Sequence, residues 1–217
     1  MKKCLILAIL FMPMFLFGQK TKLIKDKQTN EIYYVLKSDN STKHREYQKI
    51  GNKNVLLIKG YYKNGVIDSI WEFSNSMGEV VQKFDFTTKS LIYYKISESD
   101  QNKLYKVITD SASQYVLLDR PPIFVGGEDY FMQELMANIQ YPLDAFTNGI
   151  SGRVSVSFVI DKNGETDSFK VLKPIGHGLD EEAVRVLKSL PNNWLPGIYK
   201  GQPVNVEMIY PINFTLK

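Results

Sequence analysis

The segment that decides the fold of the C-terminal half is Gly152–Ile160, with the sequence GRVSVSFVI. Its apolar residues fall at every second position from Val154 to Ile160, and polar residues fill most positions between them. Such alternation predicts a β-strand with one face on a core and the other face toward solvent. The run DKNG at 161–164 predicts a hairpin turn, because glycine adopts a positive φ at little cost. A second strand is then expected at 167–172.

Two amphipathic helices are expected around this hairpin. Residues 128–139 place apolar side chains four positions apart, and residues 179–190 carry an apolar stripe. The second helix begins with the acidic run at 180–182, whose charge suits the positive end of the helix dipole. Its polar face is expected to be exposed to water and consists of Glu181, Glu182, Arg185 and Lys188.

The last predicted strand, 204–216, is the longest and alternates again from Val204 to Leu216. Pro211 lies inside it and has no backbone N–H to donate, which favours a position at the edge of a sheet. An open edge can pair with an incoming extended chain. The C-terminal part is therefore predicted to be α+β, a two-layer α-β-β-α-β domain with a small antiparallel sheet.

Residues 19–110 are expected to form a small all-β meander domain. Three segments rich in β-branched and aromatic residues are separated by short polar turns, and they are 31–37, 55–62 and 80–86. Basic residues outnumber acidic ones in this part, whereas acidic residues outnumber basic ones after it. The short polar seam between the two parts predicts a linker over 111–121.

A weak repeat runs through this N-terminal part. Gly65 and Gly78 each end a unit made of an aromatic residue, a turn and a glycine. Successive hairpins of a meander produce such a pattern. Residues 55–95 resemble, in this respect, the degenerate MORN-type repeats of secreted bacterial proteins.

The first 18 residues are typical of a secretory signal peptide. A charged start precedes an apolar run over 4–17, and cleavage is expected after Gly18. The run is interrupted by Pro13 and is shorter than the roughly 20 residues that span a bilayer. A retained inner-membrane anchor stays open as the alternative. Cleavage would remove Cys4, the single cysteine, and leave a mature chain without disulfides.

Catalysis, metal binding and nucleic-acid binding find no support in the motifs. The chain has 217 residues and a formal net charge of +4, without the dense basic run of a nucleic-acid-binding surface. His44 and His177 are far apart in sequence, and neither has a second ligand at zinc spacing. The acidic alternation at 161–167 lacks the glycine position of a calcium loop. We expect no enzyme, no metal and no cofactor.

A series of landmarks from about residue 122 to 217 resembles the TonB C-terminal domain family. They include PIFVGG at 122–127, the tyrosine–proline pair at 141–142, the strand at 152–160 and LDEEA at 179–183. The resemblance implies a periplasmic domain that binds the TonB-box peptides of TonB-dependent outer-membrane receptors and is linked to transmembrane transport. In that family the peptide adds to the edge of the last strand, a binding mode called β-augmentation.

The candidate partner-binding residues follow from the resemblance and lie in two segments. The main chain of Asn205, Glu207 and Ile209 is expected to pair with the receptor peptide, and the tyrosine–proline region is expected to contact it. The complete set is Asn138, Gln140, Tyr141, Val204, Asn205, Val206, Glu207, Met208 and Ile209.

The chain departs from a full energy transducer in two ways. Such a transducer has a retained N-terminal helix that docks on the ExbB–ExbD motor, and a long proline-rich spacer. Here the apolar run is short, and residues 19–110 have the pattern of folded β-structure. We therefore expect an exported periplasmic protein, with ExbB–ExbD as a partner only if the chain is membrane-anchored. A non-energised scaffold that binds envelope proteins or cell wall is the alternative, and a homodimer stays open.

Overall fold

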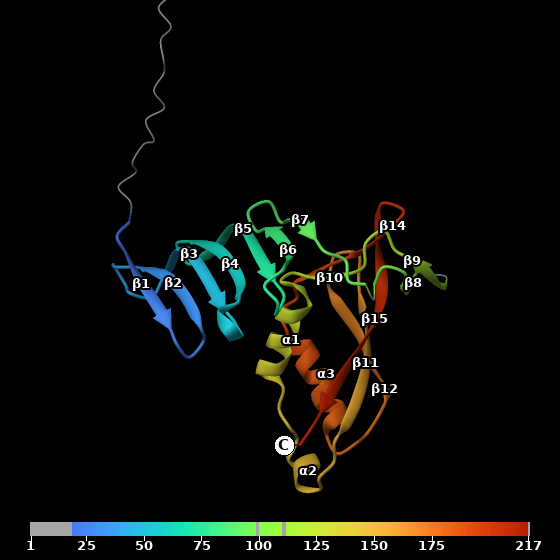
Figure 1. The fold of residues 1–217 in the computed structure, drawn as a ribbon. Helices are drawn as coiled ribbons and strands as arrows, with labels where there is room; N and C mark the ends of the chain where they lie inside the picture. Colours follow the sequence, from blue (N-terminus) through green and yellow to red (C-terminus); the bar gives the residue numbers. More distant parts are fainter. Residues whose placement is uncertain (1–18, 99, 110–111, 217) are drawn as a thin grey trace, which may run out of the picture.

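The structure is a computed structural model that describes residues 19–98, 100–109 and 112–216. The chain is α+β, with antiparallel sheets and a few helices (Figure 1). The expected signal peptide and its cleavage site after Gly18 lie outside the described residues. None of the helices in the described part is long and apolar enough to cross a membrane.

Seven strands of the N-terminal part pair in sequence order as an antiparallel meander (Figure 1). The expected segments 31–37, 55–62 and 80–86 correspond to the second, fourth and sixth strands, and the strands between them were not predicted. The strands are β1 Thr21–Asp26, β2 Glu31–Leu36, β3 Lys43–Ile50, β4 Leu56–Lys63, β5 Val66–Ser74, β6 Val80–Asp85 and β7 Ser90–Tyr94. A short 3-10 helix, Asn52–Asn54, connects β3 to β4.

One face of the meander carries an aromatic core. The indole of Trp71 stacks on Tyr47 with ring centroids 5.3 Å apart, and it also contacts Tyr62 edge-on. The ring lies directly over Gly60, where an added Cβ would come within 2.1 Å of it. Gly60 is therefore required by close approach rather than by its backbone conformation.

The C-terminal sheet has the strand order β12-β11-β15-β8-β9. Its strands are β8 Leu104–Ile108, β9 Ser113–Leu117, β11 Gly152–Ile160, β12 Thr166–Lys173 and β15 Gln202–Phe214. A short strand, β14 Gly197–Tyr199, forms a hairpin with the start of β15. Strand β9 occupies part of 111–121, which the sequence predicts as a linker, and β8 joins this sheet rather than the meander.

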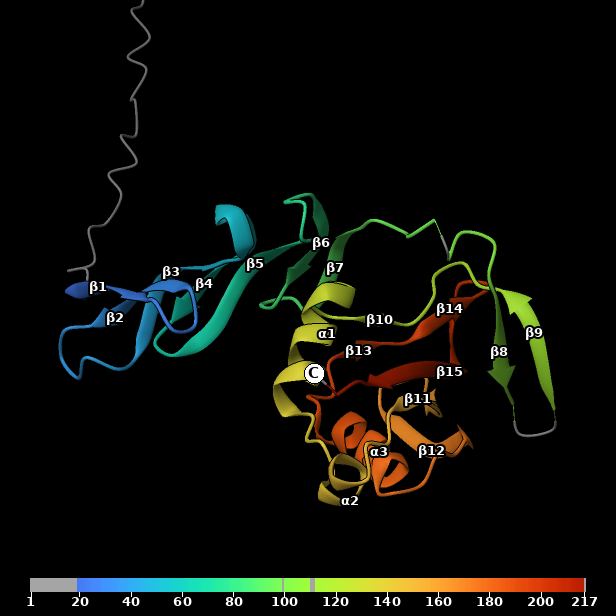
Figure 2. The same ribbon diagram turned by 60° about the horizontal axis from the view of Figure 1, so that its bottom comes forward.

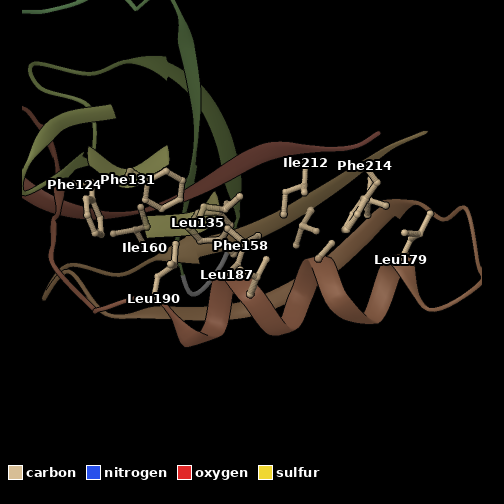
Figure 3. Packing of buried hydrophobic residues seen from close by; sticks show 14 of the residues in the cluster. Phe124, Phe131, Leu135, Phe158, Ile160, Leu179, Leu187, Leu190, Ile212 and Phe214 are labelled. Carbon is tan, nitrogen blue, oxygen red and sulfur yellow. The ribbon is translucent and has the colours of Figure 1, made fainter. Parts of the chain in front are cut away.

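Helices α1 Gly127–Asn138 and α3 Leu179–Ser189 pack on one face of this sheet, and the short α2 Leu143–Thr147 lies near its end. Two short strands, β10 Ile123–Phe124 and β13 Trp194–Leu195, pair beside α1. Figure 3 shows the side chains of α3 pointing toward the sheet. Alternation correctly predicts the burial of Val154, Val156, Phe158, Ile160, Val206, Ile212 and Phe214. Ser157 is an exception, because it lies on the face of β11 predicted to be exposed and is nevertheless buried.

The polar face of α3 differs from the expectation at one residue. Glu182 is 8% exposed, although its place in the helix pattern predicts exposure to water. It is buried because its carboxylate accepts hydrogen bonds from Arg185 and from the backbone N–H of Gln140. These partners remove the usual cost of burying a charge.

The two sheets meet where the chain enters α1 (Figure 2). Val125 and Tyr130 pack against the aromatic core of the meander. The fully buried side chain of Gln82, on β6, hydrogen-bonds the backbone of Phe124 and Gly126. The meander and the C-terminal sheet are therefore joined by a packed contact that contains buried hydrogen bonds.

Candidate functional site

The last long strand, β15, is paired along one side with β11, from Gly152↔Phe214 to Ile160↔Val206. On its other side, residues Asn205–Glu207 pair with β8. The sequence predicts that this whole edge is open, and that prediction is wrong over Asn205–Glu207. Within the described chain, β8 covers no residue of β15 beyond Glu207, and residues 202–204 at the start of the strand pair with β14.

The strand that covers this edge belongs to the β8–β9 hairpin, whose inner face is buried. Tyr105 and Val107 pack against Val206, which has no exposed surface. Lys106 and Glu207 lie opposite each other, with Nζ and Oε2 2.6 Å apart. The hydrogen bond to Glu207 raises the pKa of Lys106.

Both ends of this hairpin are fixed by hydrogen bonds. Before β8, the hydroxyl of Tyr105 donates to Asp100 over 2.7 Å. After β9, the backbone N–H of Asp119 donates to the Ile198 carbonyl over 2.8 Å, and Arg120 Nη2 donates to the Pro196 carbonyl over 2.8 Å. The chain before the hairpin is therefore tied to β8, and the chain after it is tied to β14 and to the residue before β14.

The sequence contains a weak signal for this hairpin, which lies in the composition of its two short strands. Leu104–Ile108 and Ser113–Leu117 are each five residues long, with aromatic and β-branched residues typical of strands. Both segments are too short for alternation alone to separate them from loop.

The tyrosine–proline segment after α1 is held by α3. The N–H of Gln140 donates to Glu182 Oε1 over 2.6 Å, and Arg185 Nη2 donates to the Asn138 carbonyl over 2.7 Å. Burial opposes ionisation of Glu182, but the hydrogen bonds from Arg185 and Gln140 outweigh it and lower the pKa of that carboxyl. The main chain of Asn138 and Gln140 is thus engaged inside the domain.

Tyr141 also has a structural role. Its hydroxyl donates to the Ile150 carbonyl over 2.6 Å, and its ring meets Phe214 edge-on. Ile209, the candidate residue of β15 nearest to Phe214 in sequence, lies five residues away, which is roughly 17 Å in an extended strand. The structure therefore does not bring the two segments of candidate residues together.

An open hollow of about 520 Å³ lies between the tyrosine–proline segment and the start of α3. Tyr141, Leu143 and Arg185 contribute to its lining. Leu143 is exposed, and so is Phe146 in the following turn of α2. This apolar rim is a surface separate from the sheet edge.

The remaining candidate side chains have structural partners. His177 Nδ1 lies 2.8 Å from Asp144 Oδ2, and His44 Nδ1 accepts the N–H of Asn64. Asp161 Oδ1 accepts the N–H groups of Asn163 and Glu165, as a turn requires. Within the described residues, no group of three or more metal-ligating side chains comes together.

Comparison with known proteins gives one family. Residues 137–216 match the model of the Gram-negative bacterial TonB protein C-terminal domain. Neither the curated proteins nor the solved structures compared with the chain gave a match. The matched family is a protein-interaction domain rather than an enzyme, and its members are periplasmic or membrane-anchored. The segment that matches the TonB C-terminal domain family therefore contains α2, α3 and the long strands β11, β12 and β15.

Proposed function

We propose that this protein binds the TonB-box peptides of TonB-dependent outer-membrane receptors by adding them as a strand to an open edge of its C-terminal sheet. The observation that supports the proposal most directly is an antiparallel sheet with unpaired edges, three of whose strands, β11, β12 and β15, lie in the segment that matches the TonB C-terminal family. An unpaired edge presents N–H and C=O groups that an extended peptide satisfies. The function is then part of transport across the outer membrane.

On the side of the sheet that carries β15, two stretches of edge are available for this mode in the described chain, and the opposite edge of the sheet is β12. One is β15 beyond Glu207, where Ile209 is 59% exposed. The other is the outer side of β9, which has no partner strand among the described residues. The tyrosine–proline segment lies far from the second stretch and is proposed only as a support for the fold.

We also propose that the protein is exported, and that the meander stands where a full transducer has its spacer. Contact with ExbB–ExbD belongs to this proposal only if residues 1–18 remain as an anchor. The N-terminal residue of the native protein decides between these forms, since a chain that begins at Gln19 has lost the anchor. Intact Met1 in the inner membrane would favour the energy transducer.

The test of the function is a direct binding measurement with the full chain. Peptides that contain the TonB boxes of receptors from the same cell are titrated into the protein and followed by calorimetry. A matched peptide with proline at alternate positions is the control, because it cannot supply the backbone donors of a strand. Binding of the first peptide alone supports the proposal, whereas no binding of any receptor peptide contradicts it.

The scaffold alternative is favoured by one separate observation. A pocket of about 160 Å³ lies between the meander and α1, lined by Tyr47, Trp71 and Tyr130, with Glu31 and Glu134 also contributing. Aromatic faces with a few polar groups are typical of small-ligand sites. Co-sedimentation of the full chain with purified cell wall tests this role, and an unchanged soluble fraction would count against it.

A further inference from the structure

We propose that the docking edge for the extended peptide is the outer side of β9, Ser113–Leu117, rather than β15. This inference rests on the proposed function and names the strand that performs it. The β8–β9 hairpin lies on the edge that the last strand would otherwise offer, and it moves the open edge outward by two strands (Figure 2).

The hairpin is too well held to be a placeholder for an incoming peptide. Its own residues Tyr105 and Val107 are buried against Val206, and the Lys106–Glu207 ion pair joins it to β15. A peptide that replaced β8 would expose both apolar side chains and separate the two charges. Burial of apolar surface therefore favours keeping the hairpin in place.

The direction of the backbone groups follows from one hydrogen bond at the end of the hairpin. The N–H of Thr109 donates to the carbonyl of Ala112 over 2.9 Å. In an antiparallel ladder only every second residue directs its N–H and C=O toward a given neighbour. Counting from Thr109, Lys106 directs these groups toward β15, and its partner there is Glu207.

The same alternation shows how little of the β15 edge remains usable. Beyond Glu207, the residues whose backbone groups point to the open side are Ile209, Pro211 and Asn213. Pro211 has no N–H, so the two remaining donors are separated by a gap. A peptide would lose the central hydrogen bond of the ladder on this stretch.

Strand β9 instead offers a row of outward backbone N–H and C=O groups that no proline interrupts. Its outward N–H and C=O groups belong to Ser113, Tyr115 and Leu117, and its register with β8 is continuous from Leu104↔Leu117 to Ile108↔Ser113. The strand SQYVL contains no charge and no proline. Natural edges are usually protected by lysine, proline or a bulge, and β9 has none of these.

The side chains on this edge indicate the chemistry of the occupant. Tyr115 is 69% exposed, Leu117 is 53% exposed and Leu104 is 58% exposed. By strand alternation these residues lie on the face of the sheet opposite the buried Tyr105 and Val107. An extended peptide with apolar side chains at every second position would place them on this face, and Tyr115 and Leu117 would contact them.

The test compares two proline variants of the full chain, one for each edge. The probe is a blocked, dye-labelled peptide of about six residues with valine and threonine alternating, a usual strand length. Tyr115→Pro removes one outward donor from an edge strand, where proline is tolerated. We expect it to weaken peptide binding by about tenfold. The causes are the loss of one hydrogen bond between the strand and the peptide and a clash of the peptide with the proline ring. Thermal unfolding and circular dichroism check that the variant is folded.

Two further variants separate the explanations. Tyr115→Ala keeps the backbone donor and should weaken binding less than Tyr115→Pro. Ile209→Pro changes the competing edge. If Ile209→Pro abolishes binding while Tyr115→Pro does not, β15 is the docking strand and this inference fails, although the proposed function stands. If the wild type binds neither this peptide nor any receptor peptide, the proposed function fails as well.

A reversible lock tests whether the hairpin stays in place. Lys106→Cys combined with Glu207→Cys places two cysteines at directly opposite positions, at a Cα separation that a disulfide can span. The oxidised and reduced forms of this one protein should bind the peptide equally. Loss of binding on oxidation, with recovery on reduction, would show that the peptide displaces the hairpin and would overturn the inference. Peptide-independent dimers that Tyr115→Pro converts to monomers would overturn it in favour of a second copy as the occupant.

Discussion

The side-chain amide of Gln82 donates a hydrogen bond to the carbonyl oxygen of Phe124 over 3.1 Å, across the junction between the two sheets. Its Oε1 accepts the N–H of Gly126 over 2.5 Å. Gln82 is fully buried, so water cannot replace either bond. This one residue satisfies two backbone groups at the entrance to α1 and fixes the position of the meander.

Replacement of this residue tests the junction. Gln82→Leu keeps a side chain of similar size but leaves the Phe124 carbonyl and the Gly126 N–H buried without partners. We expect the free energy of unfolding in urea to fall by about 2–4 kcal/mol. Gln48→Leu is the control, because the side chain of Gln48 makes an exposed contact with Glu46. An equal loss in both variants would contradict the role given to Gln82.

The lowered pKa of Glu182 leads to a prediction of how the free energy of unfolding changes at acid pH. Its pKa is lowered in the folded protein, so it stabilises the fold above its unfolded pKa of about 4.3. That contribution is lost as the pH falls through the lower folded pKa. Glu182→Gln should lose about 1–2 kcal/mol at pH 7 and show a shallower fall in stability below about pH 5.

The control for this change is Glu181→Gln, one residue away on the exposed side of α3. Urea unfolding measured at several pH values compares the two variants with the wild type. Parallel pH curves for the wild type and Glu182→Gln would show that this carboxylate does not govern acid stability.

The close contact between Gly60 and Trp71 leads to a prediction of how one added methyl group changes the stability of the meander. A Cβ at this position would lie 2.1 Å from the Trp71 ring, so Gly60→Ala must displace the indole. We expect a loss of about 1–3 kcal/mol and a shift in tryptophan fluorescence. Lys59→Ala, at the exposed neighbouring position, should change neither quantity appreciably.

The hydroxyl of Tyr141 is expected to contribute to the stability of the fold and not to peptide binding. Tyr141→Phe removes the 2.6 Å hydrogen bond to the Ile150 carbonyl and keeps the ring against Phe214. Thermal unfolding should show a loss of about 1 kcal/mol, the usual value for such a bond. Unchanged stability together with weaker peptide binding would instead assign the hydroxyl to the receptor peptide.

The sequence predicts those elements whose evidence is local. The strict alternation of Gly152–Ile160 and the apolar stripe of α3 each carry enough residues to define a face, and the structure buries those faces. The predicted exposure of Glu182 is wrong because its burial depends on Arg185 and on the N–H of Gln140. Gln140 is 42 residues away from Glu182 in the sequence. Helical periodicity contains no information about such a partner.

The sequence predicts only part of the open edge of β15 correctly. Pro211 correctly marks a stretch of β15 that pairs with β11 on one side and has no partner strand on the other side in the described chain. The pairing of Ile108 with Asn205 could not be foreseen, because about a hundred residues separate them and the two strands of the hairpin are short. The polar seam near residue 111 therefore predicts a linker where the structure has a hairpin.

The central position of β15 also bears on the order of folding. This strand is made last of the six described strands in its sheet, yet it separates β11 from β8. During synthesis or export, the two hairpins have no sheet to join until residues 202–214 emerge. The meander, built from neighbouring strands, can form earlier because its contacts are close in sequence. The edges of β8 and β11 that face β15 therefore stay without their partner strand until the last strand is made.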